Sequence, residues 1–108
     1  MKYDRIIAVD FDGCLATNEF PNIGSEITET IRRVKEEQRK GSKIILWTCR
    51  KDDELTAAVE YCRDNGLEFD YINENAAESI KMFGKDTRKI YATAYLDDRN
   101  ITLKEVEG

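Results

Sequence analysis

The hydrophobic and polar positions along the chain fall into two recurring patterns. Short, nearly continuous apolar runs, typical of strands that are buried on both faces, occupy residues 5–9, 43–47, 69–72 and 91–96. Segments with apolar residues every three or four positions, typical of helices, occupy residues 26–40, 52 to about 65, and 76–83. Because the two patterns alternate, the sequence predicts a β-α-β-α-β-α-β chain with a parallel sheet covered by helices. The charged tail from Arg99 is left unassigned.

Length and composition predict a single domain, residues 1–108. The chain has 108 residues, of which 41% are hydrophobic and 36% charged, a globular but rather polar composition. No apolar run approaches the roughly 18–20 residues that cross a membrane. The first five residues lead directly into a predicted strand and leave no room for a signal peptide. Three cysteines form no CxxC pair, as expected of free thiols in a reducing cytoplasm.

The net charge and the lack of histidine limit which ligands the protein can bind and which residues can transfer protons. A net charge of −5 argues against non-specific binding to nucleic acid, because the phosphates require a basic surface on the protein. A phosphorylated substrate remains compatible with this charge if a bound cation reverses the local field. The chain contains no histidine, so proton transfer must use carboxylates, lysines, tyrosines or thiols.

Polar side chains follow three of the four predicted strands. Asp10 and Asp12 end the first, Thr48 ends the second, and Asp97 and Asp98 end the fourth. With a strand order of 4-1-2-3, the order reverses between strands one and four, where ligands bind in such sheets. The four aspartates would then converge and raise one another's pKa unless a hard cation, most plausibly Mg²⁺, lies among them. Taken alone, each of these residues also fits a solvated turn or an ordinary strand end.

The motifs "DFDGCL", "ILWT", an upstream lysine and "YLDD" resemble the four motifs of the haloacid dehalogenase (HAD) superfamily of phosphohydrolases. They come in the family's order and span residues 6–98. The resemblance implies a three-layer α/β/α, Rossmann-like, HAD-like domain. The segment "GCLATNEFPNIG" and the stretch before Lys89 leave no room for the cap domain of many members. Capless members often use a macromolecular substrate or an oligomeric partner as a lid, so a homodimer is worth testing.

The resemblance also implies a role for each acidic residue. Asp10 would be the nucleophile that forms an aspartyl-phosphate, and Asp12 the general acid and base. The Asp12 backbone carbonyl would help hold Mg²⁺, which Asp98 would ligate directly. Asp97 would orient a metal-bound water or the lysine. The metal site therefore comprises Asp10, Asp12, Asp97 and Asp98, and Thr48 would hydrogen-bond a phosphoryl oxygen.

The motif lysine and the substrate contacts are predicted less directly. Lys81, Lys85 and Lys89 all precede the fourth strand; Lys89, immediately before it, is preferred. Gly13, Thr48, Cys49 and Arg50 are the predicted substrate-binding residues, although Arg50 could instead pair with the aspartates. Trp47 is predicted to belong to the core. Cys14 stands where the family usually has Thr or Val, and with Cys49 it suggests sensitivity to oxidants.

These observations predict a Mg²⁺-dependent phosphomonoester hydrolase that uses an aspartyl-phosphate intermediate. Its partner would be a phosphorylated small molecule or macromolecule. One alternative is a phospho-signalling module resembling a receiver domain, although there the phosphorylated aspartate ends the third strand and the lysine the last. The other alternative is a HAD-like domain that binds phosphate without turnover, against which intact Asp10 and Asp12 argue.

Overall fold

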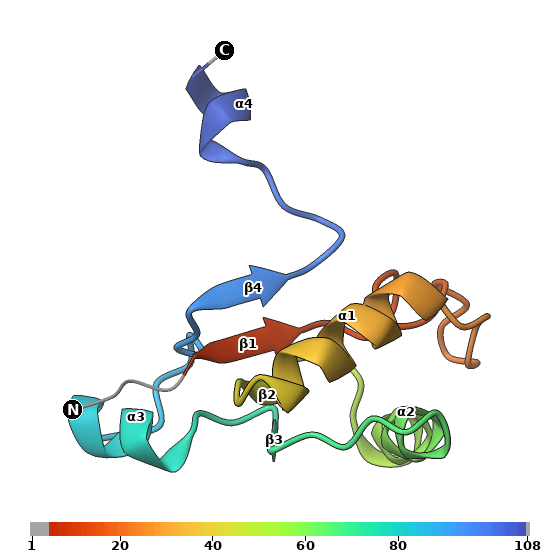
Figure 1. Cartoon of the computed structure of the whole chain (residues 1–108), viewed down its shortest axis with the longest axis horizontal. Helices are drawn as coiled ribbons and strands as arrows, with labels where there is room; N and C mark the ends of the chain where they lie inside the picture. The colour runs from red at the N-terminus through yellow and green to blue at the C-terminus, as the bar shows by residue number, and fades with distance from the viewer. Residues whose placement is uncertain (1–4, 108) are drawn as a thin grey trace.

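The computed structural model describes residues 5–107, and its centre is a four-stranded, all-parallel sheet (Figure 1). The strands are β1 (Ile6–Val9), β2 (Lys43–Leu46), β3 (Tyr71–Ile72) and β4 (Ala94–Leu96). They lie in the order β3-β2-β1-β4, which is the succession 4-1-2-3 when it is followed from the β4 edge. The third and fourth strands are shorter than the apolar runs that predicted them. Residues 1–4 and 108, the ends of the predicted domain, lie outside the described part of the chain.

Four helices accompany the sheet. They are α1 (Thr28–Arg39), α2 (Asp52–Asp64), α3 (Ala77–Phe83) and α4 (Leu103–Glu107). The first three follow the periodic segments of the sequence closely, with ends that differ by a residue or two. The short α4 lies in the tail that the sequence pattern left unassigned. No helix within residues 5–107 is both long and apolar enough to span a membrane.

Both faces of the sheet bury apolar side chains, as the continuous apolar runs of β1 and β2 require. Alternate residues of a strand point to opposite faces. One face carries Ile7, Val9, Ile44 and Leu46, which pack with buried residues of α1 and α2. The other carries Ile6, Ala8 and Ile45, which pack with Ala76 and Ile90, the residues that precede α3 and β4. The strands are therefore covered on both sides by segments of their own chain.

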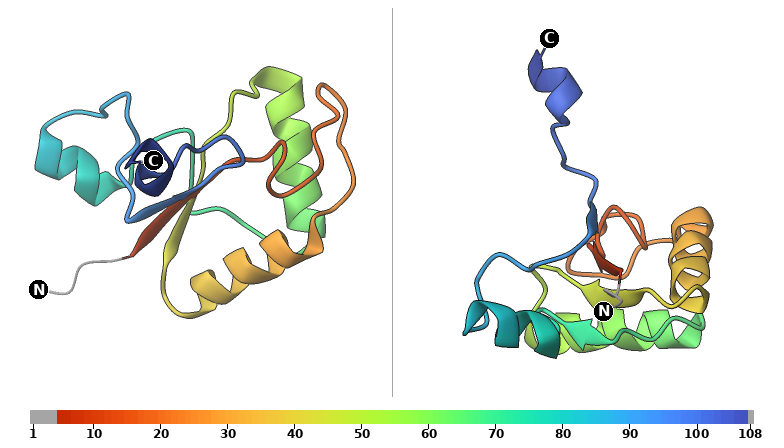
Figure 2. Two further views of the ribbon diagram at one scale, coloured as in Figure 1. Left: turned by 90° about the horizontal axis from the view of Figure 1, so that it is seen from above. Right: turned by 60° about the vertical axis from the view of Figure 1, so that its left-hand side comes forward.

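The C-terminal tail contrasts with this packed body. Figures 1 and 2 show α4 standing away from the rest of the molecule after β4. Its apolar side chains stay largely in solvent, with Leu103 81% and Val106 71% exposed. At the edge of the sheet, β4 itself is only partly covered. The body from β1 to β4 thus contains the core, and the functional residues must be sought at its strand ends.

Candidate functional site

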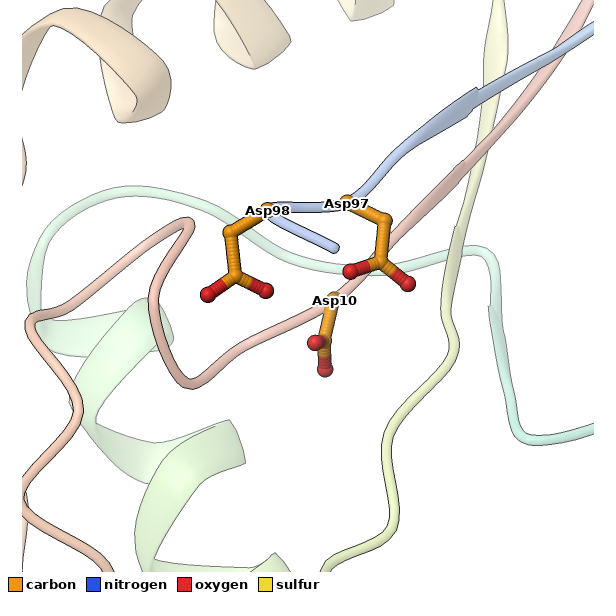
Figure 3. Close-up of side chains that lie close together, drawn as sticks. All are labelled: Asp10, Asp97 and Asp98. Carbon is orange, nitrogen blue, oxygen red and sulfur yellow. The ribbon is translucent and has the colours of Figure 1, made fainter. Parts of the chain in front are cut away.

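Three carboxylates meet where β1 and β4 end. Asp10 follows β1, and Asp97 and Asp98 follow β4, its parallel neighbour, with Val9 and Leu96 in register. The Asp10 N–H donates a hydrogen bond of 3.0 Å to the Leu96 carbonyl and continues this pairing. Each of the three side chains offers one oxygen within 4.8 Å of the other two. Figure 3 shows the three side chains close together. The sequence prediction that these residues converge is in agreement with this geometry.

Gly13 makes the approach of Asp98 possible. Its φ of +86° lies in the left-handed region, which residues with a side chain adopt at a cost. A Cβ at this position would collide with the Asp98 carboxylate. Two separate requirements, the turn after β1 and the space for Asp98, therefore call for glycine here. Because it has no side chain, Gly13 leaves the space that the Asp98 carboxylate occupies.

The acidic group formed by Asp10, Asp97 and Asp98 changes the pKa of Asp10, the candidate nucleophile. Burial first, and then the neighbouring carboxylates of Asp97, Asp98 and Asp12, together raise the pKa of Asp10 from 3.8 to about 6. A hydrogen bond of 2.7 Å from the Phe11 N–H to Asp10 Oδ1 acts in the opposite direction. Within residues 5–107, no lysine or arginine forms an ion pair with Asp10, Asp97 or Asp98. The described chain leaves this negative charge uncompensated.

An open hollow of about 230 Å³ adjoins these carboxylates, lined by Asp10, Trp47, Thr48, Cys49 and Asp97. The Thr48 N–H donates to Asn73 Oδ1 at 2.8 Å, which fixes the strand end, and the Thr48 hydroxyl oxygen accepts from the Arg50 N–H at 3.2 Å. The prediction that Trp47 is a core residue is wrong. Trp47 is 37% exposed because it lies at the open hollow just after β2, and its ring packs on Tyr95 with centroids 5.7 Å apart.

The Asp12 carboxylate does not join the acidic group, so the prediction that all four aspartates converge needs correction. It points to Arg50 instead, with Arg50 Nη2 2.7 Å from Oδ1 and Nε 2.8 Å from Oδ2. The buried guanidinium holds this side chain apart from the other three carboxylates. The backbone carbonyl of Asp12 remains the atom that the resemblance assigns to the metal.

The prediction that Arg50 binds substrate is also corrected. Its side chain is completely buried, and all five of its N–H groups donate to protein oxygens. None is left for a phosphoryl group. The alternative, that Arg50 pairs with an aspartate, is the arrangement in the structure.

Lys89 does not reach the carboxylates. It is exposed, and its Nζ lies over the Tyr95 ring, 5.9 Å from the centroid. The segment that carries it runs along the second face of the sheet before β4 begins, at the opposite end of the strand from Asp97. Lys85, the alternative to Lys89, is exposed and has no ion-pair partner among the described residues. Neither lysine forms an ion pair with Asp10, Asp97 or Asp98 in the described chain, so which one is the motif lysine stays a prediction.

Comparison with solved structures identifies one informative match. A conserved protein coded by a locus from Bacteroides thetaiotaomicron superimposes with a TM-score of 0.80 and 37% sequence identity. The match covers 92% of this chain and 79% of that one. The chain belongs to the family of that conserved protein. No protein-family model matches the sequence, and neither does any curated protein. The name of that protein states no activity, so the function of this chain has to be argued from the residues of its site.

The two cysteines near the site differ in exposure. Cys14 is buried, and its thiol donates to the Leu96 carbonyl at 3.7 Å. Burial, followed by the charges of the nearby aspartates, raises the pKa of this thiol to about 12. A buried thiol with a raised pKa is a poor nucleophile, so oxidation is expected less at Cys14 than at an exposed cysteine. Cys49 is exposed at the rim of the hollow, where the expectation still stands.

One organising residue escaped the sequence analysis. Asn75, which lies between β3 and α3, is only 1% exposed. Its amide nitrogen donates to Asp86 Oδ1 at 2.8 Å and to the Thr87 carbonyl at 3.0 Å, and its oxygen accepts from the Tyr91 N–H at 2.7 Å. Asn75 thereby fixes the segment that bears Lys89. An asparagine has no distinctive sequence pattern, and only its burial reveals the role.

Proposed function

We propose that this protein is a Mg²⁺-dependent phosphomonoester hydrolase that acts through an aspartyl-phosphate on Asp10. The supporting observation is the group of three carboxylates at two adjacent strand ends, which lies beside an open hollow without a compensating cation from residues 5–107. Clustered carboxylates repel one another and are costly to maintain. Their convergence is explained if the group serves to bind a cation and a phosphorylated ligand.

The donor set fits magnesium. Carboxylate oxygens are hard ligands, and Mg²⁺ typically binds one or two of them, with waters and substrate phosphate completing its shell. Asp10 and Asp98 would hold the ion, with the Asp12 carbonyl as the resemblance implies and Asp97 beside them. When bound, the ion would lower the pKa of Asp10 and offset charge on the phosphoryl group.

The residues of the chain would carry the reaction in two displacements. An Asp10 carboxylate oxygen attacks phosphorus and forms an acyl-phosphate bond as the bond from phosphorus to the leaving oxygen breaks. Asp12, after taking up a proton from solvent, gives it to that oxygen, and the alcohol departs. A water, whose proton Asp12 accepts, then attacks phosphorus and releases phosphate and Asp10. The Thr48 hydroxyl would donate a hydrogen bond to a phosphoryl oxygen throughout.

The three-layer, HAD-like interpretation of the fold belongs to the same proposal. The described connection between β1 and α1 holds no extra domain, and the hollow beside Asp10 is open. An open site admits a phosphorylated macromolecule as readily as a metabolite, and a second copy of the chain would be an alternative lid. The cytoplasm is the compartment in which its three cysteines, all free, would remain reduced.

The deciding experiment measures Mg²⁺-dependent release of phosphate from p-nitrophenyl phosphate and from a panel of phosphorylated metabolites. The wild-type protein is compared with Asp10→Asn and with Asp64→Asn, a matched change at an exposed position of α2. We expect turnover that Asp10→Asn abolishes and Asp64→Asn leaves intact. Wild-type turnover no greater than that of Asp10→Asn on every substrate would refute the proposal.

The same experiment addresses both alternatives. A long-lived phosphoprotein formed from a small phosphodonor, and absent in Asp10→Asn, would favour the receiver-like signalling module. Saturable binding of phosphate without turnover would favour the non-catalytic domain. The position of the acidic group at the ends of β1 and β4 supports the hydrolase over the receiver-like module, and the presence of both Asp10 and Asp12 supports it over the non-catalytic domain.

A further inference from the structure

Arg50 is an unusual residue for its place in the chain. It follows β2 by four residues, yet its side chain has no exposed area, while the Asp12 carboxylate that it contacts is 15% exposed. The two side chains form a bidentate pair, with N–O distances of 2.7 and 2.8 Å. Such a planar fork fixes both the position and the plane of a carboxylate.

The backbone holds the arginine itself in place. Its Nη1 donates to the carbonyls of Pro21 and Glu54, and its Nη2 to the carbonyl of Asn22. These three acceptors come from the loop that precedes α1 and from the first turn of α2. Because two separate segments hold the guanidinium, it has no alternative orientation that preserves its hydrogen bonds.

Two aromatic rings complete the enclosure. The guanidinium carbon lies 4.9 Å from the centroid of the buried Phe11 ring and 5.2 Å from that of Phe20, which is 57% exposed. Contacts of this kind favour a cation over a ring face. The arginine is thus restrained by rings as well as by hydrogen bonds.

Stability alone does not account for this arrangement. Desolvation of two charges largely offsets their attraction, and apolar residues of similar volume often stabilise a fold as well. What the pair does provide is a carboxylate held rigidly two residues after Asp10. Arg50 engages one lone pair on each Asp12 oxygen, and no other described residue donates to them.

We propose that Arg50 is a positioning residue, which fixes the Asp12 carboxylate at the angle needed to transfer a proton to and from the leaving oxygen. The inference rests on the proposed hydrolase function and assigns Arg50 a role through Asp12, without contact to the substrate. It replaces the expectation that Arg50 binds phosphate.

Dependence on the leaving group provides the test. A p-nitrophenolate departs readily without a proton, whereas an alkoxide needs one, so a misplaced acid slows alkyl phosphates selectively. We expect Arg50→Lys, which keeps the charge and loses the fork, to lower kcat for an alkyl phosphate by about 10²-fold. The loss on p-nitrophenyl phosphate should be about tenfold smaller, with KM little changed. Arg32→Lys, on the exposed side of α1, is the matched control and should alter neither rate.

A second variant serves if Arg50→Lys does not fold by circular dichroism. Phe20→Leu removes only an exposed ring from the enclosure, and should lower the ratio of alkyl to aryl kcat several-fold in the same direction. Equal losses on both substrates in Arg50→Lys, or an unchanged ratio in Phe20→Leu where it alone folds, would overturn the inference. A wild-type protein without turnover would refute the hydrolase proposal instead, so the two failures are distinguishable.

Discussion

Asp10 and Asp12 lie two residues apart, yet their surroundings are opposite. Asp12 is matched by a buried arginine that satisfies its charge with two hydrogen bonds. Asp10 faces Asp97 and Asp98, and no described cation forms an ion pair with any of the three. One carboxylate is compensated by the fold, and the other is left with a charge that a ligand can compensate.

The two carboxylates therefore affect the stability of the folded protein in different ways. A buried charge with a full set of partners needs no ligand, and removing one partner exposes the cost of burying the other. A cluster of like charges on an open surface destabilises the empty protein and stores free energy for cation binding. Four changes test this contrast, beginning with the largest expected effect.

Arg50→Met should destabilise the protein by about 3–5 kcal/mol, because it leaves the Asp12 carboxylate poorly solvated and unpaired. Urea unfolding followed by circular dichroism gives the free energy. The double variant Asp12→Leu, Arg50→Met should recover part of the loss, since no charge then remains buried. Arg32→Met on the exposed surface is the control, with a change too small to resolve. Equal stability of Arg50→Met and wild type would contradict the compensated pair.

Addition of Mg²⁺ should have the next largest effect and act on the other carboxylates. At a concentration 100-fold above its dissociation constant, a bound ligand stabilises the folded state by about 2.7 kcal/mol. We expect the unfolding temperature of the wild-type protein to rise with Mg²⁺ and to fall back on chelation with EDTA. Asp98→Asn should lose most of this response, and Asp64→Asn none of it. A similar response in all three proteins would show that the ion binds elsewhere.

Asp10→Asn should stabilise the metal-free protein by about 1–2 kcal/mol at pH 7. The folded pKa of about 6 exceeds the ordinary value of 3.8, so ionisation of Asp10 opposes folding. Each pKa unit corresponds to about 1.4 kcal/mol, reduced here by solvent screening.

The stability difference between Asp10→Asn and the wild type should depend on pH. Below about pH 4, Asp10 is protonated in both the folded and unfolded states and imposes no penalty. Between about pH 4 and 6 the penalty grows, and above about pH 6 it is complete. The advantage of Asp10→Asn over wild type should therefore appear across that window. Glu60→Gln, at an exposed position of α2, should show no such trend in the same denaturant titrations.

Lys89→Met should change stability least, by about 0.5 kcal/mol, because only an exposed contact with the Tyr95 ring is lost. If Lys89 neutralised the acidic group, its removal would be far more costly. Lys85→Met serves as the paired variant in the same unfolding assay. A large loss specific to Lys89→Met would place this lysine with the carboxylates, against the geometry described here.

Much of the fold could be predicted from the sequence because its signals are local. The apolar runs of β1 and β2 and the periodic faces of α1 and α2 predicted those elements within a few residues. The tail after Arg99 could not be assigned, because a charged segment with scattered apolar residues has no dominant period. Trp47 was misplaced because hydrophobicity alone does not say whether a helix will cover that part of the sheet.

The sequence by itself determined the parallel α/β organisation and the place of Asp10, Asp97 and Asp98 at adjacent strand ends. Residues at the ends of parallel strands must share one edge, whatever the details of packing. Only the tertiary structure decided that Asp12 pairs with Arg50, 38 residues away, and that Lys89 lies over Tyr95. Side-chain partners depend on the turns that aim them and on the burial around them. The spacing of residues along a chain specifies neither.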